Sequence, residues 1–163
     1  MVHISSDITR KGLAGIQALD HRYETYQEGI YSPEFTLLTY ETMYGQAREE
    51  LAKGKPVVLD ASFKERSERE RAVRIAHELE AEFFVIECTA LESEIQRRLN
   101  RRTQVGEETL SDARWEIYSQ QKADWQPIKE VSEDHYIQLD TTGSRQDTIR
   151  TLLQRVFARL LSS

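Results

Sequence analysis

Four short apolar runs, separated by long segments with helical periodicity, constrain the fold of this chain most. The runs have the length of β-strands, and strands that alternate with helices indicate a parallel sheet. We therefore predict an α/β fold, and a chain of 163 residues is expected to form a single domain over residues 1–163. The four runs are residues 3–5, 57–59, 83–88 and 136–139.

The segments between the runs carry helix start and stop signals. Ser32, Pro33 and Glu34 form a typical helix start, and Gly54 suits the end of the same helix. Other helices are predicted over about residues 65–80 and 91–102, after a cap at residues 111–112, and after a cap at Ser144.

Composition excludes several classes of protein. Charged residues make up 31% of the chain, the formal net charge is -6, and no apolar stretch approaches the ~18 residues of a membrane span. The first residues lack the features of a secretory signal, so we expect a cytoplasmic protein without a membrane partner. A lone cysteine, Cys88, excludes an internal disulfide, and core packing explains it better than a reactive thiol.

Three aspartates lie at or just after the ends of predicted strands: Asp7, Asp60 and Asp140. In open α/β sheets the ligand crevice lies beyond the carboxyl ends of the strands, so acids there can converge on one site. Asp60 ends a buried run, where a carboxylate is costly unless it is paired, hydrated or bound to a cation. We interpret Asp60 as functional, Asp7 as either functional or a helix cap, and Asp140 as a turn residue.

Arginines are concentrated in residues 97–102, at positions Arg97, Arg98, Arg101 and Arg102. A spacing of four places like charges side by side, which weakens a helix, so this cluster favours an anionic ligand such as phosphate. The alternative is a solvated basic helix end, with Glu94 offsetting Arg98. We interpret residues 97–121 as a lid-like region.

A second basic group alternates with glutamates, so most of it is predicted to be a solvated face. Glu65 with Arg69, and Glu70 with Arg74, are predicted surface pairs four residues apart. The sequence contains no His-Glu-x-x-His, Gly-x-Ser-x-Gly or paired cysteines, which argues against metal hydrolases and serine hydrolases.

Several motifs, taken in order, resemble one known family. They are Ser6-Asp7-x-x-Arg10-Lys11, Tyr31-Ser32-Pro33-Glu34, Val58-Leu59-Asp60-Ala61-Ser62-Phe63 with Arg69, Arg97-x-x-x-Arg101, and Ser111-Asp112-Ala113. Over nearly the whole chain they resemble the P-loop kinase-like ATPases of the AAA type, relatives of polynucleotide, zeta-toxin-like and gluconate-type kinases. The resemblance implies a three-layer fold, with a parallel sheet and helices on both faces.

The resemblance also implies roles for individual residues. Asp60 would take the Walker B position and act on Mg²⁺ directly or through water, and Asp7 would orient or deprotonate the hydroxyl that attacks the γ-phosphate of ATP. Arg97 and Arg101 would be catalytic lid residues that stabilise the transferring charge. The substrate- or phosphate-binding residues would be Arg10, Tyr31, Arg69, Arg98 and Arg102.

One part of the family pattern has no counterpart in this sequence: the first strand, its Gly-x-x-x-x-Gly-Lys-[Ser/Thr] loop and the following helix. Gly54-Lys55 is followed by Pro56, and no lysine follows Gly12-Leu13-Ala14-Gly15. Without the loop, the amides and lysine that hold the β- and γ-phosphates are lost. The resemblance therefore implies a sheet without its first, central strand, whose neighbours begin at Val57 and Phe83.

We expect either an N-terminally truncated kinase or a homodimer that repairs the gap, and the retained Asp7 and Asp60 favour truncation. The expected function is ATP-dependent phosphate transfer to a hydroxyl of a small molecule or nucleotide, impaired without the loop. ATP and Mg²⁺ are implied as cofactors of the full-length family member. The alternatives are a noncatalytic anion-binding or regulatory domain and, disfavoured by the acidic balance, a nucleic-acid-binding module.

Overall fold

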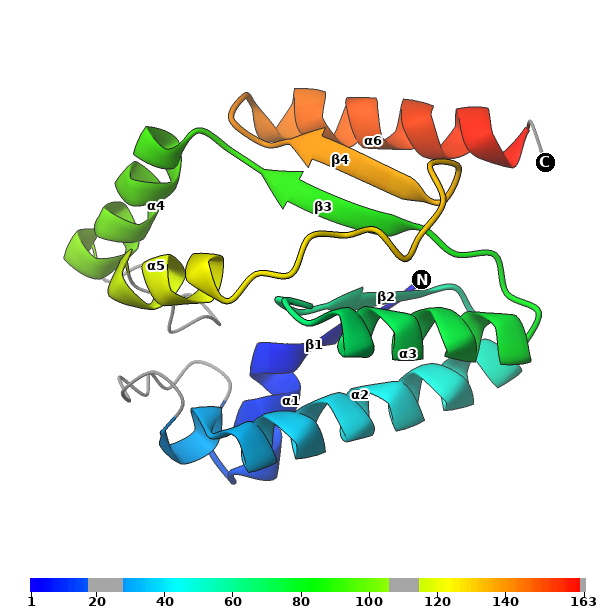
Figure 1. Ribbon diagram of the computed structural model, residues 1–163, viewed down its shortest axis with the longest axis horizontal. Helices are drawn as coiled ribbons and strands as arrows, with labels where there is room; N and C mark the ends of the chain where they lie inside the picture. Colours follow the sequence, from blue (N-terminus) through cyan, green and yellow to red (C-terminus); the bar gives the residue numbers. More distant parts are fainter. Residues whose placement is uncertain (18–27, 106–114, 162–163) are drawn as a thin grey trace.

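The computed structural model describes residues 1–17, 28–105 and 115–161, without the side chains of residues 102–105 and 116. Strands and helices alternate along this part of the chain (Figure 1), and the predicted α/β fold with parallel strands is confirmed. The described helices include none that is long and apolar enough to cross a membrane. The elements are β1 (Val2–Ser5), α1 (Ser6–Leu13), the short 3-10 helix η1 (Gly29–Tyr31), α2 (Pro33–Ala52), β2 (Val57–Asp60), α3 (Arg66–Glu78), β3 (Val85–Thr89), α4 (Glu92–Val105), α5 (Trp115–Ala123), β4 (Tyr136–Asp140) and α6 (Arg145–Leu160).

The four described strands form two separate parallel pairs. β1 pairs with β2, with Ser5 opposite Asp60, and β3 pairs with β4, with Thr89 opposite Asp140. All four strands run in the same direction in Figure 1. The described residues therefore contain two two-stranded sheets, because β2 and β3 are not hydrogen-bonded to each other.

The best-packed core lies under one face of the β1–β2 pair. Met43 and Ala47 of α2 pack against Ile4, and Tyr44 of α2 joins Ile75 of α3 in an adjacent cluster. Successive side chains of a strand point to opposite faces, so Ile4 and Leu59 can reach this core. Helices α2 and α3 thus hold β1 and β2 in place from one side.

The opposite face of the strands is much less covered. His3, Val58 and Asp60 share one exposed face of the β1–β2 pair. In β3, Ile86 and Cys88 are exposed, although their β4 neighbours are buried. The prediction that Cys88 packs in the core is therefore wrong, because the packing that buries its neighbour Leu139 on β4 does not extend to Cys88 on β3.

Several helix ends follow the sequence signals. Ser32 Oγ accepts a hydrogen bond from the Phe35 amide at 3.2 Å, and Ser144 Oγ accepts one from the Asp147 amide at 3.2 Å. Gly54 has a φ of 72° and donates its amide to the Leu51 carbonyl at 2.8 Å, which ends α2. These three predictions are confirmed, whereas the predicted cap at residues 111–112 lies outside the described residues.

Candidate functional site

The carboxyl ends of the strands point toward one end of the molecule, where α1 begins and where α4 and α5 lie (Figure 1). Asp60 is the last residue of β2, and its cross-strand neighbour Ser5 is the last residue of β1. Since α1 begins at Ser6, Asp7 follows the end of the strand next to Asp60. Both predicted acids therefore belong to the same edge of the β1–β2 pair.

Asp60 has a half-exposed carboxylate that contacts a histidine. Its Oδ2 lies 2.9 Å from Nε2 of His3, and the two side chains are 63% and 54% exposed. The register pairs His3 with Val58, so His3 and Asp60 are diagonal neighbours on one face of the strand pair. The contact of His3 with Asp60 was not predictable, because nothing in the sequence sets the register of β1 against β2.

Asp7 lies in the first turn of α1 and is not its cap residue. The N-cap is Ser5, whose side chain makes no capping hydrogen bond. The cap interpretation of Asp7 is therefore wrong, because the helix begins earlier than the sequence suggested. A carboxylate in the first turn still interacts favourably with the helix dipole.

Arg10 and Tyr31, both predicted to bind substrate, lie against each other. Arg10 is 7% exposed and donates from Nη1 to the Ile30 carbonyl at 2.5 Å and to Thr36 Oγ1 at 3.2 Å. Its guanidinium carbon lies 4.9 Å from the centre of the Tyr31 ring. Burial lowers the pKa of Arg10, although Tyr31 and Asp7 act to raise it. These contacts tie α1 to η1 and α2.

The next residue, Lys11, is also buried, at 1% exposure. Its burial was not predicted from the sequence, because a lysine on a short helix can face either the solvent or the neighbouring α2.

Arg69 has hydrogen-bond partners within the protein on several of its nitrogens. Nε donates to Glu130, and Nη1 donates to the Phe63 carbonyl at 2.8 Å and to the Lys64 carbonyl at 3.2 Å. The guanidinium also lies 5.7 Å from the centre of the Trp125 ring. Arg69 therefore stabilises the loop after Asp60.

The glutamate partners in α3 differ from the predicted ones. Arg69 pairs with Glu130, and Glu70 pairs with Arg66 at 2.7 Å. The predicted Glu65–Arg69 pairing is wrong because Glu65 is the N-cap of α3, where its side chain takes part in a capping box with Glu68.

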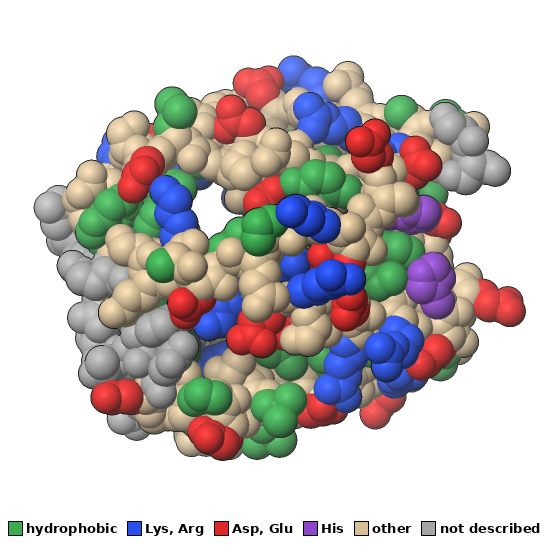
Figure 2. All heavy atoms as spheres, viewed as in Figure 1, with side chains coloured by type: hydrophobic (Ala, Val, Ile, Leu, Met, Phe, Trp, Pro, Cys, Tyr) green, Lys and Arg blue, Asp and Glu red, His purple; other side chains and the backbone are tan. Residues whose placement is uncertain are grey.

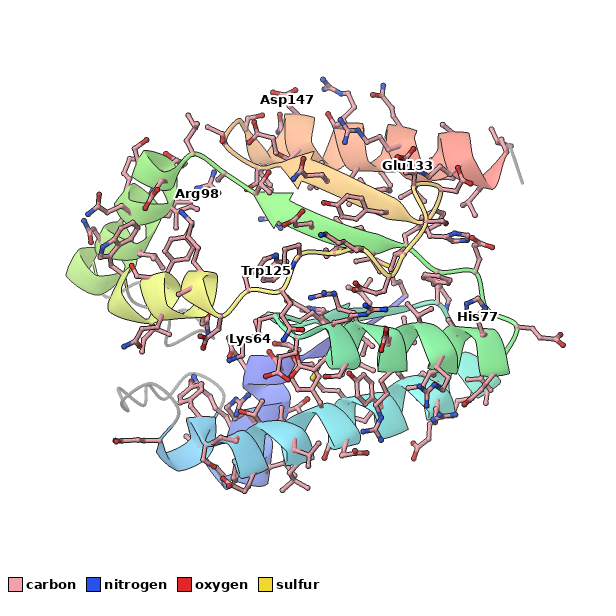
Figure 3. The ribbon with its side chains drawn as sticks, viewed as in Figure 1. Lys64, His77, Arg98, Trp125, Glu133 and Asp147 are labelled. Carbon is pink, nitrogen blue, oxygen red and sulfur yellow. The ribbon has the colours of Figure 1, made fainter. Side chains whose placement is uncertain are left out.

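Glu94 of α4 holds two of the arginines that were predicted to form a lid. Arg97 donates to both carboxylate oxygens of Glu94 at 2.7 Å, and Arg98 donates to Oε1 of Glu94 at 2.7 Å. Arg98 also reaches the Thr141 carbonyl beyond β4 at 2.5 Å (Figure 3). Hydrogen bonds from the two arginines lower the pKa of Glu94 to about 2. The prediction that the charge of Glu94 offsets that of Arg98 is confirmed, and Glu94 pairs with Arg97 as well.

The rest of the predicted lid is described in part. Arg101 is exposed in α4, and Arg102 belongs to the same helix with its side chain outside the described residues. Residues 106–114 of the predicted 97–121 region also lie outside them. α4 and α5 contact each other beyond the carboxyl ends of the strands (Figure 1).

A small pocket lies at the carboxyl ends of β3 and β4. Its volume of about 170 Å³ is below the ~300 Å³ at which small-molecule sites begin. The space-filling view shows an opening through the molecule between the α4–α5 part and the strands (Figure 2). The pocket is lined by Cys88, Thr89, Ala90, Ile95, Arg98, Leu99 and Thr141.

Asp140 beside this pocket has the predicted turn role. Its Oδ1 accepts a hydrogen bond from the Thr142 amide at 2.8 Å. Hydrogen bonds from the Thr142 side chain and amide lower the pKa of Asp140. This carboxylate therefore stabilises the turn before α6.

A comparison with models of protein families shows to which family the chain belongs. The family model of an AAA domain, a P-loop kinase-like family, matches residues 1–128, which include β1 to α5. This chain belongs to that AAA-domain family. A comparison with curated proteins found no match.

The family implies ATP and Mg²⁺ as ligands. The residues of this AAA domain suit Mg²⁺ better than they suit the triphosphate of ATP. A single half-exposed carboxylate such as Asp60 suits Mg²⁺, which usually keeps several waters and takes one or two protein carboxylates. Among the described residues, no group of three or more His, Cys, Asp or Glu side chains forms a metal cluster. The triphosphate fits less well, because the 163-residue sequence has no Gly-x-x-x-x-Gly-Lys loop.

Proposed function

We propose that this AAA domain is a phosphotransferase domain that acts on a hydroxyl of a small molecule or nucleotide. The observation that supports the proposal is the register in which Ser5 pairs with Asp60, so that α1, with Asp7 in its first turn, begins next to the end of β2. In α/β sheets of parallel strands, such paired strand ends border the ligand crevice. Two acids at this edge suit a reaction that needs a cation and a proton acceptor.

The proposed roles follow from these positions. Asp60 would hold Mg²⁺ through a carboxylate oxygen or a bound water, and Asp7 would accept the proton of the attacking hydroxyl. Mg²⁺ and ATP, when bound, supply charge neutralisation and the phosphoryl group. Arg97 would exchange Glu94 for the transferring phosphate, and Arg101 in the same helix would assist it.

We further propose that the sheet lacks its central strand, whose place is between β2 and β3. The separation of the described strands into two pairs supports this proposal. The same missing segment would carry the phosphate-binding loop, so activity of the 163-residue chain alone is expected to be impaired.

A noncatalytic role is the second candidate. The absence of the glycine–lysine loop from the sequence favours it, because the phosphates of ATP would lack their usual ligands. In this case the lid arginines would hold an anionic ligand or an acidic partner without turnover, and the domain would act as a regulatory or binding module.

Calorimetry with Mg·ATP, combined with an assay of γ-phosphate transfer to mixed sugar alcohols and nucleosides, tests the proposal. We expect weak binding that requires Mg²⁺, is lost in Asp60→Asn and persists in the control Asp140→Asn. In Asp7→Asn, binding should persist while phosphate transfer stops. Binding that is independent of Mg²⁺ and of Asp60, without any turnover, would instead establish the noncatalytic role.

A further inference from the structure

The contact between His3 and Asp60 has the spacing of two neighbouring metal ligands. Nε2 of His3 lies 2.9 Å from Oδ2 of Asp60. Two ligand atoms that each lie about 2.1 Å from one ion are about 3.0 Å apart at a right angle and about 3.4 Å apart at a tetrahedral angle. The two atoms are therefore spaced as adjacent ligands of a six-coordinate ion.

The backbone holds the two side chains on the same face of the β1–β2 pair. His3 lies opposite Val58 in the register, so Asp60 is its diagonal neighbour. Ile4 and Leu59, which precede or follow them on the two strands, point to the other face and pack in the core of α2. Because that core fixes both strands, the histidine and the carboxylate are brought together before any ion binds.

The surroundings of the pair suit an ion that keeps water ligands. The side chains of His3 and Asp60 are 54% and 63% exposed, so water can reach the remaining coordination positions. Small divalent cations in proteins commonly retain several waters and take only one or two side-chain ligands. Two ligand atoms on an accessible face are therefore enough for a site of moderate affinity.

Ser5 adds a buried hydroxyl on the same face. It lies two residues after His3 and directly opposite Asp60 in the register, and the residue is 7% exposed. Its hydroxyl does not cap α1, and it has no hydrogen-bond partner in the part of the chain that the structure describes. Buried hydroxyls are normally satisfied, and a bound water or ion commonly does so. Water on an ion held by the pair would satisfy Ser5.

The imidazole determines which class of ion fits. A carboxylate alone suits Mg²⁺, which prefers oxygen ligands. A ring nitrogen favours the divalent ions of the first transition series, whose affinity for such a site rises from Mn²⁺ through Co²⁺ to Cu²⁺. With His3 beside it, Asp60 therefore belongs to a mixed nitrogen and oxygen site.

We propose that His3 and Asp60 bind a divalent first-row transition ion in preference to Mg²⁺, with Ser5 hydrogen-bonded to one of the waters on the ion. The site rests on the proposed function only in taking Asp60 as a metal ligand. Binding requires a neutral imidazole whose ring proton is on Nδ1, so that the lone pair of Nε2 faces the ion. The direct hydrogen bond between the two side chains is then replaced by coordination.

A second histidine–carboxylate pair provides the matched control. His135 Nε2 lies 3.1 Å from Glu82 Oε1, and Nδ1 of the same ring lies 2.9 Å from Ser132 Oγ. The ring stacks on Phe83 with centroids 4.6 Å apart, and Phe84 lies beside it. These two aromatic rings offer no oxygen to an ion or to its waters, in contrast to Ser5 beside Asp60.

Calorimetry with Co²⁺ and, separately, Mg²⁺ on the 163-residue chain without nucleotide tests the proposal. We expect one Co²⁺ to bind at least about tenfold more tightly than Mg²⁺. His3→Ala should weaken Co²⁺ binding at least about tenfold and change Mg²⁺ binding much less, because only Co²⁺ uses the nitrogen. Asp60→Asn should weaken the binding of both ions, and the control His135→Ala should change neither.

Two further variants and a spectrum examine the ligands directly. His3→Asp replaces the nitrogen by a carboxylate and should reduce the preference for Co²⁺ over Mg²⁺ at least about tenfold. Ser5→Ala should weaken Co²⁺ binding by up to about tenfold, as expected of a group that holds a bound water. Nitrogen NMR of the histidine rings with Zn²⁺ should show the change at Nε2 of His3 and none at His135.

The same measurements separate this inference from the proposed function. Co²⁺ binding that depends on both His3 and Asp60, without any phosphate transfer, would remove the proposed function and keep the metal site. Phosphate transfer supported by Mg²⁺, in a chain whose Co²⁺ affinity is unchanged by His3→Ala, would do the reverse. Co²⁺ binding that survives Asp60→Asn, is lost in His135→Ala, or is no tighter than that of Mg²⁺ would overturn the inference.

Discussion

Arg69 and Glu130 form an ion pair in which both side chains are nearly inaccessible, at 2% and 4% exposure. They are 61 residues apart in the sequence. This pair joins α3 to the segment between α5 and β4. A second pair, Lys64 with Asp124 at 3.6 Å, joins the loop that follows Asp60 to the same segment (Figure 3).

Removing one partner of this pair should be strongly destabilising. Glu130→Ala is expected to lower the free energy of unfolding by about 3–5 kcal/mol, because it leaves the Arg69 charge buried without its counter-ion. Urea denaturation followed by circular dichroism measures the change. The double variant Arg69→Met/Glu130→Leu should be more stable than Glu130→Ala, since no charge is left buried. A loss below about 1 kcal/mol for Glu130→Ala would contradict this role.

The same carboxylate predicts a pH dependence of stability. Burial acts to raise the pKa of Glu130, but hydrogen bonds from Arg69 and from backbone amides outweigh it, and the pKa is lowered. The folded pKa thus lies below the unfolded value of about 4.3, so the contribution is complete above that value and is lost as the pH falls through the folded pKa. Stability should decline below about pH 4, and Glu130→Gln should flatten this part of the profile.

Arg10 should matter for stability more than a surface arginine does. Arg10→Met removes the buried charged hydrogen bonds to the Ile30 carbonyl and to Thr36 Oγ1, which is expected to cost about 1.5–3 kcal/mol. The control is Arg48→Met, whose pair with Glu78 is 46% and 43% exposed and should contribute no more than about 1 kcal/mol. Thermal unfolding of the two variants compares them directly. Equal losses would show that the buried contacts of Arg10 add nothing.

Glu80 offers a stabilising substitution. It follows the C-cap Leu79 of α3 with a φ of 52°, a left-handed conformation that costs a residue with a Cβ about 1 kcal/mol. Glu80→Gly should therefore raise the free energy of unfolding by up to about 1 kcal/mol. Glu80→Ala keeps the Cβ and should give no gain, so a similar effect of both variants would refute the explanation.

Glu94 should titrate far below an ordinary glutamate. Its pKa of about 2 results from hydrogen bonds with Arg97 and Arg98, so the Arg97–Glu94–Arg98 contact should persist until the pH falls toward 2. Carbon-detected NMR titration of the side-chain carboxyls measures this midpoint. Arg97→Ala should move the midpoint upward, and an unchanged midpoint in that variant would mean that Arg97 does not hold the carboxylate in solution.

The helix ends were predictable because their hydrogen bonds join residues close in sequence. Ser32 reaches the amide of Phe35, Ser144 reaches that of Asp147, and Gly54 closes α2 on Leu51. Each interaction spans only three residues, so the local sequence contains both partners. The strand positions were predictable for a similar reason, because apolar runs and their lengths are local properties.

The partners of the charged residues were not predictable in this way. Arg69 was assigned a glutamate four residues away, whereas it contacts Glu130 far along the chain. His3 meets Asp60 only because β1 and β2 pair in one particular register. A shift of one residue would turn His3 to the other face, and no local pattern encodes that choice.

The sequence by itself determined the alternation of strands and helices and the helix ends at Ser32, Gly54 and Ser144. It also determined that Asp60 ends β2 and that Asp7 follows β1. Only the tertiary structure decided which arginines are buried with partners and which carboxylate contacts His3. It also decided that the described strands form two pairs and that Val58 and Ile86 on them are exposed. The physical reason is that caps and periodicity depend on neighbours along the chain, whereas burial, register and ion pairing depend on segments that meet only after folding.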